Sequence, residues 1–474
     1  MKSVKIVWLA IFPFFLFACS EDKMDEINKE RNQALEMGAQ SIIPSIEVVS
    51  GFETAGTDIA WYATVYIEHS AGSWAQSYDA DKRTGQTVGT LFNNNWNSIY
   101  DCLMVCNDVL KKTDPATGNE KDNKFARGIA QTLMAYNLAT LTDMWGEIPW
   151  SEALKGAENL QPKYDKQSTI YPEIFKLLDD AIKNFGEATN ISSVGDYIYK
   201  GSKDKWTKAA YSLKARYSLR LTNVDANAAT KALDAASKGF ASAADGMLFS
   251  SYENTATGEN PWFQFLSDRA HLSVGTTLYN LMLERHDTLR MAAYFTKIGG
   301  EYKPAPNGGS QQTQGGVYSN SKITADGKVA PTPIMTFHEL KFIVAEAKFR
   351  KGDATWKDDL KAAVEANFVF HGLTAAQGTT YYNGSVARKL TPGNELNEIL
   401  LQKYIGAYEF EATEAYNDYR RVPGFITLNN PNNTTVGFVW RFPYPTSEQS
   451  SNSANIPKVN VFTDKLWWAG GAEK

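Results

Sequence analysis

"TFHELKFIVAEAKFRKGD", residues 336–353, is the stretch that decides the fold. Apolar residues recur in it at spacings of three and four: Phe337, Leu340, Val344 and Ala347. This period predicts a helix with one apolar face. Gly352 and Asp353 follow the last periodic residues, which is typical of a helix end.

A second periodic segment follows this turn directly. Its apolar residues have the same spacing: Trp356, Leu360, Val364 and Phe368. A helix, a Gly-Asp turn and an antiparallel helix make one tetratricopeptide-like (TPR-like) unit, and the small residues Ala345 and Ala347 allow the two helices to approach closely.

Helical periodicity extends over much of the remaining chain. Residues 125–140 and 204–220 each predict a helix, and residues 168–186 and 204–239 are candidates for further helix pairs, although no strict 34-residue period is present. Residues 394–421 predict one long helix that ends before Pro423-Gly424. Its acids are expected to face solvent or to pair with Arg420 and Arg421: Glu409, Glu411 and Glu414.

Long stretches between these helices lack a clear period. They are rich in Gly, Asn, Ser, Thr and aromatic residues: 70–92, 241–272, 299–334 and 423–474. Loops of this length are usually functional or disordered, and their aromatic content argues against disorder. The sequence therefore predicts a mainly α fold in which TPR-like helix pairs pack against a loop-rich irregular half.

The N-terminus has the layout of a secretory signal. Lys2 and Lys5 precede an apolar run that is too short to span a bilayer, and Ala18 is followed by Cys19. This pattern resembles a bacterial lipobox, so we expect a signal peptide over 1–18 and a lipidated tether over 19–40 that begins at an acylated Cys19. An ordinary signal peptide with an incidental cysteine is the alternative.

Acidic residues follow Cys19 at once: Glu21, Asp22, Asp25 and Glu26. They resemble the surface-export signal of Bacteroidetes lipoproteins, and a solvated tether is the alternative. The whole chain has 48 Lys and Arg and 53 Asp and Glu, spread along its length, so no basic block suggests a nucleic-acid partner. Cys102 and Cys106 lie one helical turn apart and are expected to pack as small apolar groups.

Five segments, in order along the chain, resemble the SusD/RagB family of Bacteroidetes nutrient-binding lipoproteins, in its SusD-like branch. They are "NNNWNSIYDCLMVCNDVL" (93–110), "DMWGEIPWSEAL" (143–154), "FIVAEAKFRKGD" (342–353), "LQKYIGAYEFEATEAYNDYRR" (401–421) and "RFPYPTSEQSSNSANI" (441–456). One departure is "HDTLR" (286–290), which stands where the family commonly has Asp-Pro-Arg.

The resemblance implies a single SusD-like domain over 41–474. Its TPR-like helices would span about 93–240 and 334–421, and its loop-rich ligand face would span about 58–92, 241–333 and 423–474. The protein would sit at the outer membrane, lipid-anchored through Cys19 and facing the cell exterior, as a lid on a SusC-like TonB-dependent transporter. It would capture oligosaccharide, or in some members peptide, and would not be an enzyme. No cofactor is implied, and a structural calcium ion is left open.

A sugar binder needs a flat aromatic side chain for the ring face and amide or charged groups for the hydroxyl rim. Residues 70–83, 260–269 and 299–309 hold this mixture, and the ligand-binding candidates are Trp74, Gln76, Tyr78, Arg83, Trp262 and Tyr302. For each aromatic residue the alternative is packing beneath a long loop.

Catalytic and metal-binding residues are not predicted. "HELKF" (338–342) begins like a zinc-protease helix and lacks the second histidine. A surface glycoside hydrolase, whose carboxylate pair need only meet in space, and a TPR scaffold for a protein partner remain as alternatives.

Overall fold

The computed structural model describes residues 37–323 and 327–474. Gly38–Lys474 forms one unit. The predicted signal peptide, Cys19 and most of the predicted tether lie outside the described residues. Within the described part, no helix combines the length and the apolar character that crossing a bilayer requires.

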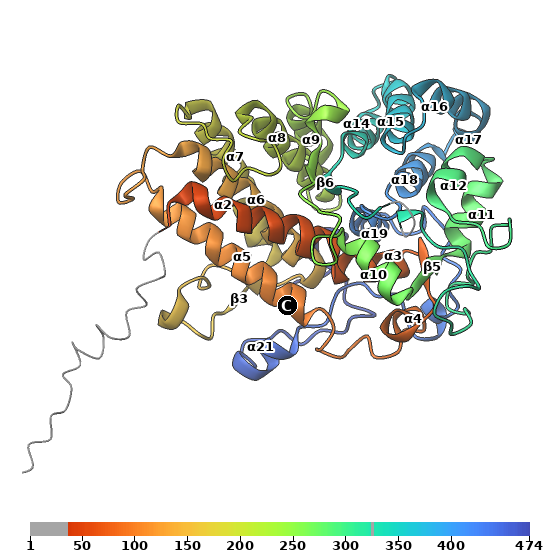
Figure 1. Cartoon of the computed structure of the whole chain (residues 1–474), viewed down its shortest axis with the longest axis horizontal. Coiled ribbons are helices and arrows are strands. Elements are labelled where there is room, and N and C mark those ends of the chain that lie inside the picture. Colours follow the sequence, from red (N-terminus) through yellow and green to blue (C-terminus); the bar gives the residue numbers. More distant parts are fainter. Residues whose placement is uncertain (1–36, 324–326) are drawn as a thin grey trace, which may run out of the picture. The chain divides into compact units, whose positions relative to one another are not determined.

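The unit is mainly helical, as the sequence predicts, and its longer helices form a scaffold (Figure 1). These helices are α2 (Ala39–Val48), α3 (Asp58–Tyr66), α5 (Asn93–Lys112), α6 (Lys124–Trp145), α7 (Gln167–Glu187), α8 (Lys203–Arg220), α9 (Ala228–Ala236), α14 (Phe337–Lys351), α15 (Trp356–Phe370), α18 (Glu395–Gly406) and α19 (Ala412–Arg421). Shorter helices are α4 (Ala75–Asp81), α10 (Pro261–Arg269), α11 (Thr276–Glu284), α12 (Thr288–Tyr294), α16 (Ala375–Tyr381), α17 (Ala387–Lys389), α20 (Asn432–Thr435) and α21 (Thr446–Ser451). Single turns of 3₁₀ or π-helix are η1 (Val49–Thr54), η2 (Gly156–Glu158), η3 (Ala243–Asp245), η4 (Tyr382–Val386) and η5 (Trp467–Ala469).

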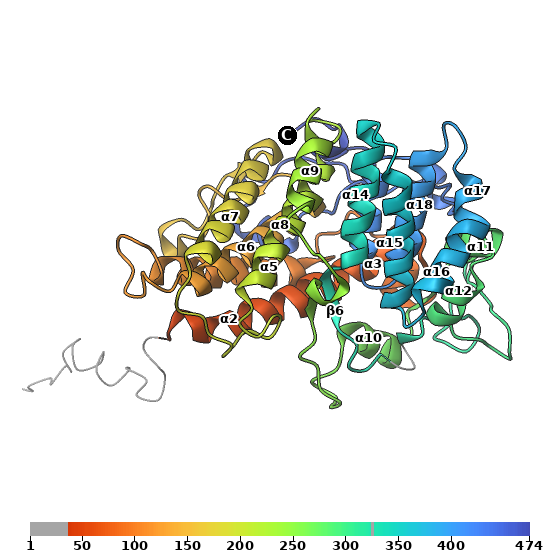
Figure 2. The same ribbon diagram turned by 90° about the horizontal axis from the view of Figure 1, so that it is seen from above.

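The scaffold helices pack as neighbours in sequence order. Helix α5 packs on α6, α6 on α7, α8 on α9 and α14 on α15, and Figure 2 shows α7, α8, α9, α14 and α15 standing side by side. Helix α14 also packs on α9 and α18. Helix α14, which residues 336–353 predict, therefore joins the helices before it in the chain to those after it.

The α14–α15 pair confirms the predicted TPR-like unit. Gly352 adopts a left-handed conformation with φ of 71°, which favours glycine at the end of a helix. Its N–H donates to Phe349 O at 3.0 Å, and the Asp353 N–H donates to Lys348 O at 3.0 Å. These two bonds form a Schellman motif. Ala345 and Ala347 are fully buried.

The predicted single helix over 394–421 is wrong. It is two helices, α18 and α19, because the chain turns at Glu409, where φ is 71°. The three acids, expected to face solvent or to pair with Arg420 and Arg421, make other contacts: Glu409 accepts a hydrogen bond from Ser321, Glu411 accepts one from Thr336 N at 3.0 Å, and Glu414 contacts Arg220 from α8. Arg421 pairs with Glu346 of α14 instead.

Short strands tie the irregular half together. Strand β1 (Ser70–Gly72) pairs antiparallel with β5 (Leu272–Val274), and β4 (Met247–Phe249) pairs with β6 (Thr332–Met335). Strand β2 (Ile148–Pro149) pairs with β3 (Tyr164–Asp165). Since α4 follows β1 and α10 precedes β5, the first pairing brings 70–83 and 260–269 to one region. Both stretches were expected to be loops, and both contain a helix.

Buried charged side chains lie where α8, α14, α18 and α19 meet, and each is at most 6% exposed. The pairs are Arg216–Glu339 (Nε–Oε1 3.0 Å), Lys403–Asp418 (Nζ–Oδ2 2.9 Å) and Arg421–Glu346 (Nη2–Oε2 2.7 Å). Removing one partner of such a pair leaves an uncompensated buried charge, which is more costly than the pair itself is stabilising.

We therefore expect Arg421→Met, which leaves the buried Glu346 with the Arg350 pair of its own helix, to lower the free energy of unfolding by about 3 kcal/mol. The matched control is Lys176→Met, which removes the exposed Lys176–Asp180 pair of α7 (2.8 Å) and should change stability by less than about 0.5 kcal/mol. Urea denaturation measures both. Similar small losses for the two variants would show that the buried charges do not hold the scaffold.

Glu47 of α2 is fully buried and accepts a hydrogen bond from Tyr197 N at 2.6 Å. Among the described residues, its Oε1 has no partner. Burial, with the nearby charge of Asp196, raises the pKa of Glu47 to about 9. The folded protein thus holds this proton more tightly than the unfolded chain does.

Stability from Glu47 is therefore fully present below its unfolded pKa of about 4.3 and is lost as the pH rises toward about 9. We expect Glu47→Gln, which cannot ionise, to exceed the wild type in unfolding free energy by at least about 1 kcal/mol at about pH 8, and to differ little at about pH 4. Urea titrations at the two pH values measure the difference. An equal effect at both would contradict it.

Candidate functional site

A cleft of about 490 Å³ opens between α3, α4 and α10, whose labels lie close together in Figure 1. We call it the α3–α10 cleft. It is lined by Phe52, Glu53, Thr57, Asp58, Trp61, Gln76, Asn94, Pro261, Gln264, Phe265, Asp268 and Arg269. Two of the three stretches that the sequence singles out for sugar-binding chemistry, 70–83 and 260–269, thus contribute to one site.

Helix α3 supplies an acid and an aromatic ring to the cleft. Asp58 and Trp61 lie three residues apart and therefore share one face of the helix, while Ile59, Ala60 and Ala63 are fully buried in the core. The Trp61 ring stacks on Phe265 of α10, with ring centres 3.9 Å apart and planes 12° from parallel. This stacked pair forms an aromatic wall of the cleft.

Helix α10 begins at a strong N-cap. The Asn260 Oδ1 accepts hydrogen bonds from Trp262 N at 2.9 Å and Phe263 N at 3.1 Å, and Pro261 occupies the first turn. The spacing of Gln264 and Asp268 then places both on the face that lines the cleft. The Asn-Pro pair is a helix-start signal that the expectation of a loop over 241–272 overlooked.

Buried polar contacts fix the chain at the end of α4. Asp81 accepts a hydrogen bond from Gly308 N at 2.7 Å, and Arg83 Nη2 donates to Asn433 Oδ1 at 2.7 Å. Asn433 in turn donates to the buried Glu68 at 3.0 Å. We call this set the polar lock. It joins four chain segments, around residues 68, 81–83, 308 and 433, and so positions Gln76, which α4 presents to the cleft.

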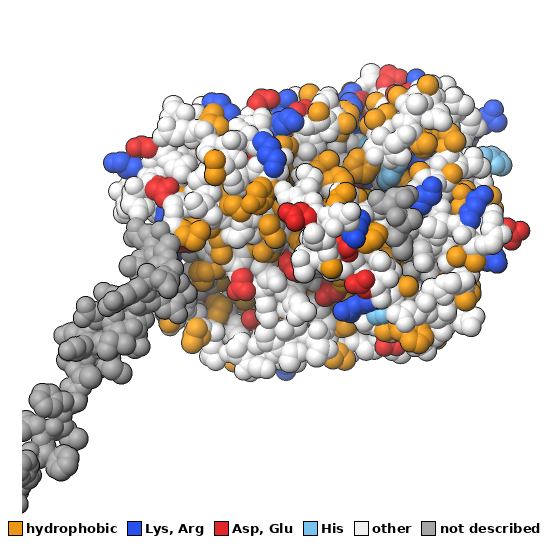
Figure 3. All heavy atoms as spheres, in the orientation of Figure 1, with side chains coloured by type: hydrophobic (Ala, Val, Ile, Leu, Met, Phe, Trp, Pro, Cys, Tyr) orange, Lys and Arg blue, Asp and Glu red, His pale blue; other side chains and the backbone are white. Residues whose placement is uncertain are grey.

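Two carboxyl groups that line the cleft have raised pKa values. Burial raises the pKa of Glu53. Burial and the charge of Glu53 raise the pKa of Asp58 to about 6, against the opposite effect of Arg269. Acidic and basic side chains are otherwise interspersed over the face in Figure 3. Over residues 37–323 and 327–474, no cluster of His, Cys, Asp and Glu is arranged to hold a metal ion.

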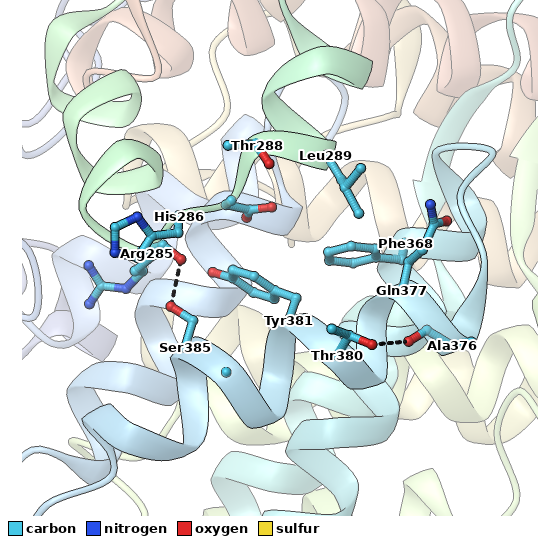
Figure 4. A pocket seen from close by; sticks show the side chains of 12 residues that line it. Arg285, His286, Thr288, Leu289, Phe368, Ala376, Gln377, Thr380, Tyr381 and Ser385 are labelled. Atoms are coloured by element: carbon cyan, nitrogen blue, oxygen red, sulfur yellow. Dashed lines mark hydrogen bonds between the residues drawn. The ribbon is translucent and has the colours of Figure 1, made fainter.

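A second cavity, of about 440 Å³, lies between the α11–α12 turn and helices α15 and α16. Tyr381, Phe368 and Leu289 form apolar walls (Figure 4). Two of its hydroxyl groups are engaged within the protein: Ser385 donates to Arg285 O at 2.6 Å, and Thr380 donates to Ala376 O at 3.0 Å. The other polar side chains of the lining include His286, Thr288 and Gln377.

The "HDTLR" turn borders this second cavity. Asp287 Oδ2 accepts from Arg290 Nε at 2.7 Å, and both side chains are buried. Arg290 also donates to Asn367 at 2.9 Å and Gln402 at 3.0 Å. The turn therefore keeps a paired acid and arginine, although two residues, Thr288 and Leu289, lie between them.

A family model described as "Starch-binding associating with outer membrane" matches residues 59–445. The chain belongs to the SusD-like family. A SusD/RagB family protein from Bacteroides thetaiotaomicron shares 33% sequence identity with it, with a TM-score of 0.85 over 92% of this chain and 100% of the other. The predicted family is confirmed.

Other solved structures share the SusD-like fold at lower identity. A chitin-binding protein has 24% identity and a TM-score of 0.77, covering 91% of this chain and 100% of the other. A chitin-binding SusD homolog from Flavobacterium johnsoniae has 19% identity and a TM-score of 0.75, covering 91% of this chain and 98% of the other. No curated protein matches the chain.

The SusD-like chain brings one predicted ligand residue, Gln76, to the α3–α10 cleft. Trp74, Tyr78 and Tyr302 are partly exposed and lie outside the lining of this cleft. Their contact with ligand stays a prediction. Arg83 is 3% exposed and serves the polar lock, so it offers no free surface in this conformation.

Trp262 is a core residue rather than a ligand platform, because only 2% of it is exposed. It borders a small internal cavity of about 10 Å³ together with Ser321 and Glu409. Its Nε1 has no hydrogen-bond partner among the described residues. The capping of α10 turns Trp262 inward and leaves Gln264 at the cleft.

Sequence reasoning missed Trp61, Glu53, Asp58 and Asn94. Trp61 stands in the apolar run "DIAWYATVY" (58–66), where nearly every residue has the character of a core residue. The spacing of three between Asp58 and Trp61 was the only available signal, and it did not show that α10 lies opposite.

We expect Trp262→Ala to lower the free energy of unfolding by about 3–5 kcal/mol, because it empties a packed site. Trp74→Ala, at a partly exposed position, should lower it by less than about 1 kcal/mol. Chemical denaturation of the two variants decides this. A stable Trp262→Ala variant would return that residue to the list of ligand candidates.

Proposed function

We propose that this SusD-like protein captures oligosaccharides in the α3–α10 cleft and delivers them to a SusC-like TonB-dependent transporter of the outer membrane. The observation that carries the proposal is the stacked Trp61–Phe265 wall beside the amides of Gln76, Asn94 and Gln264 in one cleft.

The chemistry of this wall suits a sugar ring. Axial C–H groups on one ring face pack against an aromatic surface, and the equatorial hydroxyls at the rim exchange hydrogen bonds with amides and carboxylates. The volume of the α3–α10 cleft falls within the range of about 300–1,000 Å³ that small-ligand sites occupy. One aromatic contact and a few rim hydrogen bonds, after the loss of ligand freedom, support a Kd of about 1 μM to 1 mM.

The apolar cavity shown in Figure 4 is a weaker candidate for the same ligand. Its walls are mainly apolar, and the hydroxyls of Thr380 and Ser385 are bound to backbone carbonyls. Its other polar lining groups include His286, Thr288 and Gln377, so a hydroxyl-rich ligand placed there would recover only part of its hydrogen bonds to water. The α3–α10 cleft has no such deficit.

The membrane part of the proposal draws on the N-terminal sequence and on the family. Acylation at Cys19 would anchor the protein in the outer membrane, and the acidic residues after it favour export to the cell surface. The starch-binding, outer-membrane description of the family model and the chitin-binding relatives support a glycan as the cargo. Capture without catalysis fits this role.

Peptide capture is the second candidate. The acids of the cleft suit peptide N–H groups as well as sugar hydroxyls. A peptide is bound largely through its backbone, in an extended groove. The stacked aromatic wall favours a ring-shaped ligand, and this is why the glycan is preferred.

We expect Gln76→Ala to weaken oligosaccharide binding about fivefold, the loss of about one rim hydrogen bond. Isothermal titration calorimetry with starch-derived and chitin-derived oligosaccharides measures this, after an array has ranked them. The matched control is Gln311→Ala, an exposed glutamine outside the cleft, which should bind as the wild type does.

Equal binding by the two variants would exclude the α3–α10 cleft as the ligand site. Binding of a peptide pool in place of every glycan would favour the second candidate.

A further inference from the structure

The charges that line the α3–α10 cleft are unbalanced. Glu53, Asp58 and Asp268 contribute carboxylates, and Arg269 is the one basic residue among the lining residues. Arg269 is exposed at the end of α10, whereas Glu53 in η1 and Asp58 at the start of α3 are partly buried. The inner part of the cleft therefore carries an excess of negative charge.

The inner carboxylates are poorly compensated by the protein. The Glu53 carboxylate lies 3.5 Å from Thr57 Oγ1, and that hydroxyl group already donates to Glu53 O at 2.8 Å. Burial and the charge of Glu53 raise the pKa of Asp58 to about 6, and the charge of Arg269 offsets this only in part. A group that brings positive charge to this place would relieve the repulsion between the two carboxylates.

The aromatic wall also favours a cation. Trp61 stacks on Phe265 and lines the same cleft as both acids. The face of an indole ring attracts an ammonium group by a cation–π interaction. The Nε1 of Trp61 is buried and lacks a hydrogen-bond partner within the described residues, so no hydrogen bond from this nitrogen holds the ring in place.

We propose that the captured oligosaccharide is built from amino sugars with free amines, whose ammonium group is held by Asp58 and Glu53 while its ring packs on Trp61. This rests on the proposed function and names its substrate class. An N-acetylated sugar has the same ring and lacks the charge, so it leaves the two acids uncompensated. A uronic acid would add a like charge and be repelled.

The test compares three ligands of equal length and linkage: the β-1,4-linked trimers of glucosamine, of N-acetylglucosamine and of glucose. Isothermal titration calorimetry at near-neutral pH and low ionic strength should give the glucosamine trimer a Kd at least about tenfold below that of the glucose trimer. Added salt should reduce this preference, because screening weakens the charged contact alone.

Two variants test whether Asp58 and Glu53 cause the preference for the glucosamine trimer. In Asp58→Asn, and separately in Glu53→Gln, the ratio of the two affinities should fall to about twofold or less. The matched control is Asp79→Asn, which removes an exposed carboxylate on α4 outside the lining of the cleft and should keep the ratio. Circular dichroism melting shows that each variant is folded.

The outcomes separate the inference from the proposed function. Equal binding of the three trimers would overturn the amino-sugar inference and leave glycan capture standing. Binding of none of the trimers, or of any array glycan, would overturn both. Tight binding of trilysine with no binding of sugar would replace the amino sugar by a basic peptide.

Discussion

The burial of charged side chains between α8, α14, α18 and α19 is the constraint on which the rest of the structure depends. Each ion pair joins two helices and is satisfied only in one arrangement of them, so the scaffold has little freedom to slide. Arg216 illustrates this, since it also donates to Ile334 O at 2.9 Å and so ties strand β6 to the helices. The irregular half is attached to helices whose positions these ion pairs fix.

The irregular half uses the same principle on a smaller scale. It lacks long apolar periods, and the polar lock of Glu68, Asp81, Arg83 and Asn433 supplies the fixed points that apolar packing supplies elsewhere. Together with the β1–β5 pairing, it sets α4 beside α10 before any ligand arrives. A preformed site of this kind loses less conformational entropy on binding, which would favour the proposed capture of ligand through few contacts.

Local signals in the sequence predicted the scaffold well. The period of residues 336–370 and Gly352 at the helix end predicted α14 and α15, because both depend on neighbours within a few residues. The break at Glu409 escaped prediction, since burial against Ser321 holds it and Ser321 is distant in sequence. The cleft was predicted in part, because residues 70–83 and 260–269 showed its chemistry. The sequence pointed to Trp262 as the ligand-facing ring, whereas the structure buries Trp262 and places Trp61 at the cleft. Predicting this would have required knowing which face of each helix meets the core.

A crystal structure of the protein soaked with an oligosaccharide that it binds in solution tests the central claim most directly. We expect a sugar ring packed on the face of Trp61, with its rim hydroxyls or amine within hydrogen-bond distance of Gln76 and Asp58, and a backbone unchanged around the polar lock. A sugar seated instead between Tyr381 and Phe368, or on the helical scaffold away from α3 and α10, would contradict it.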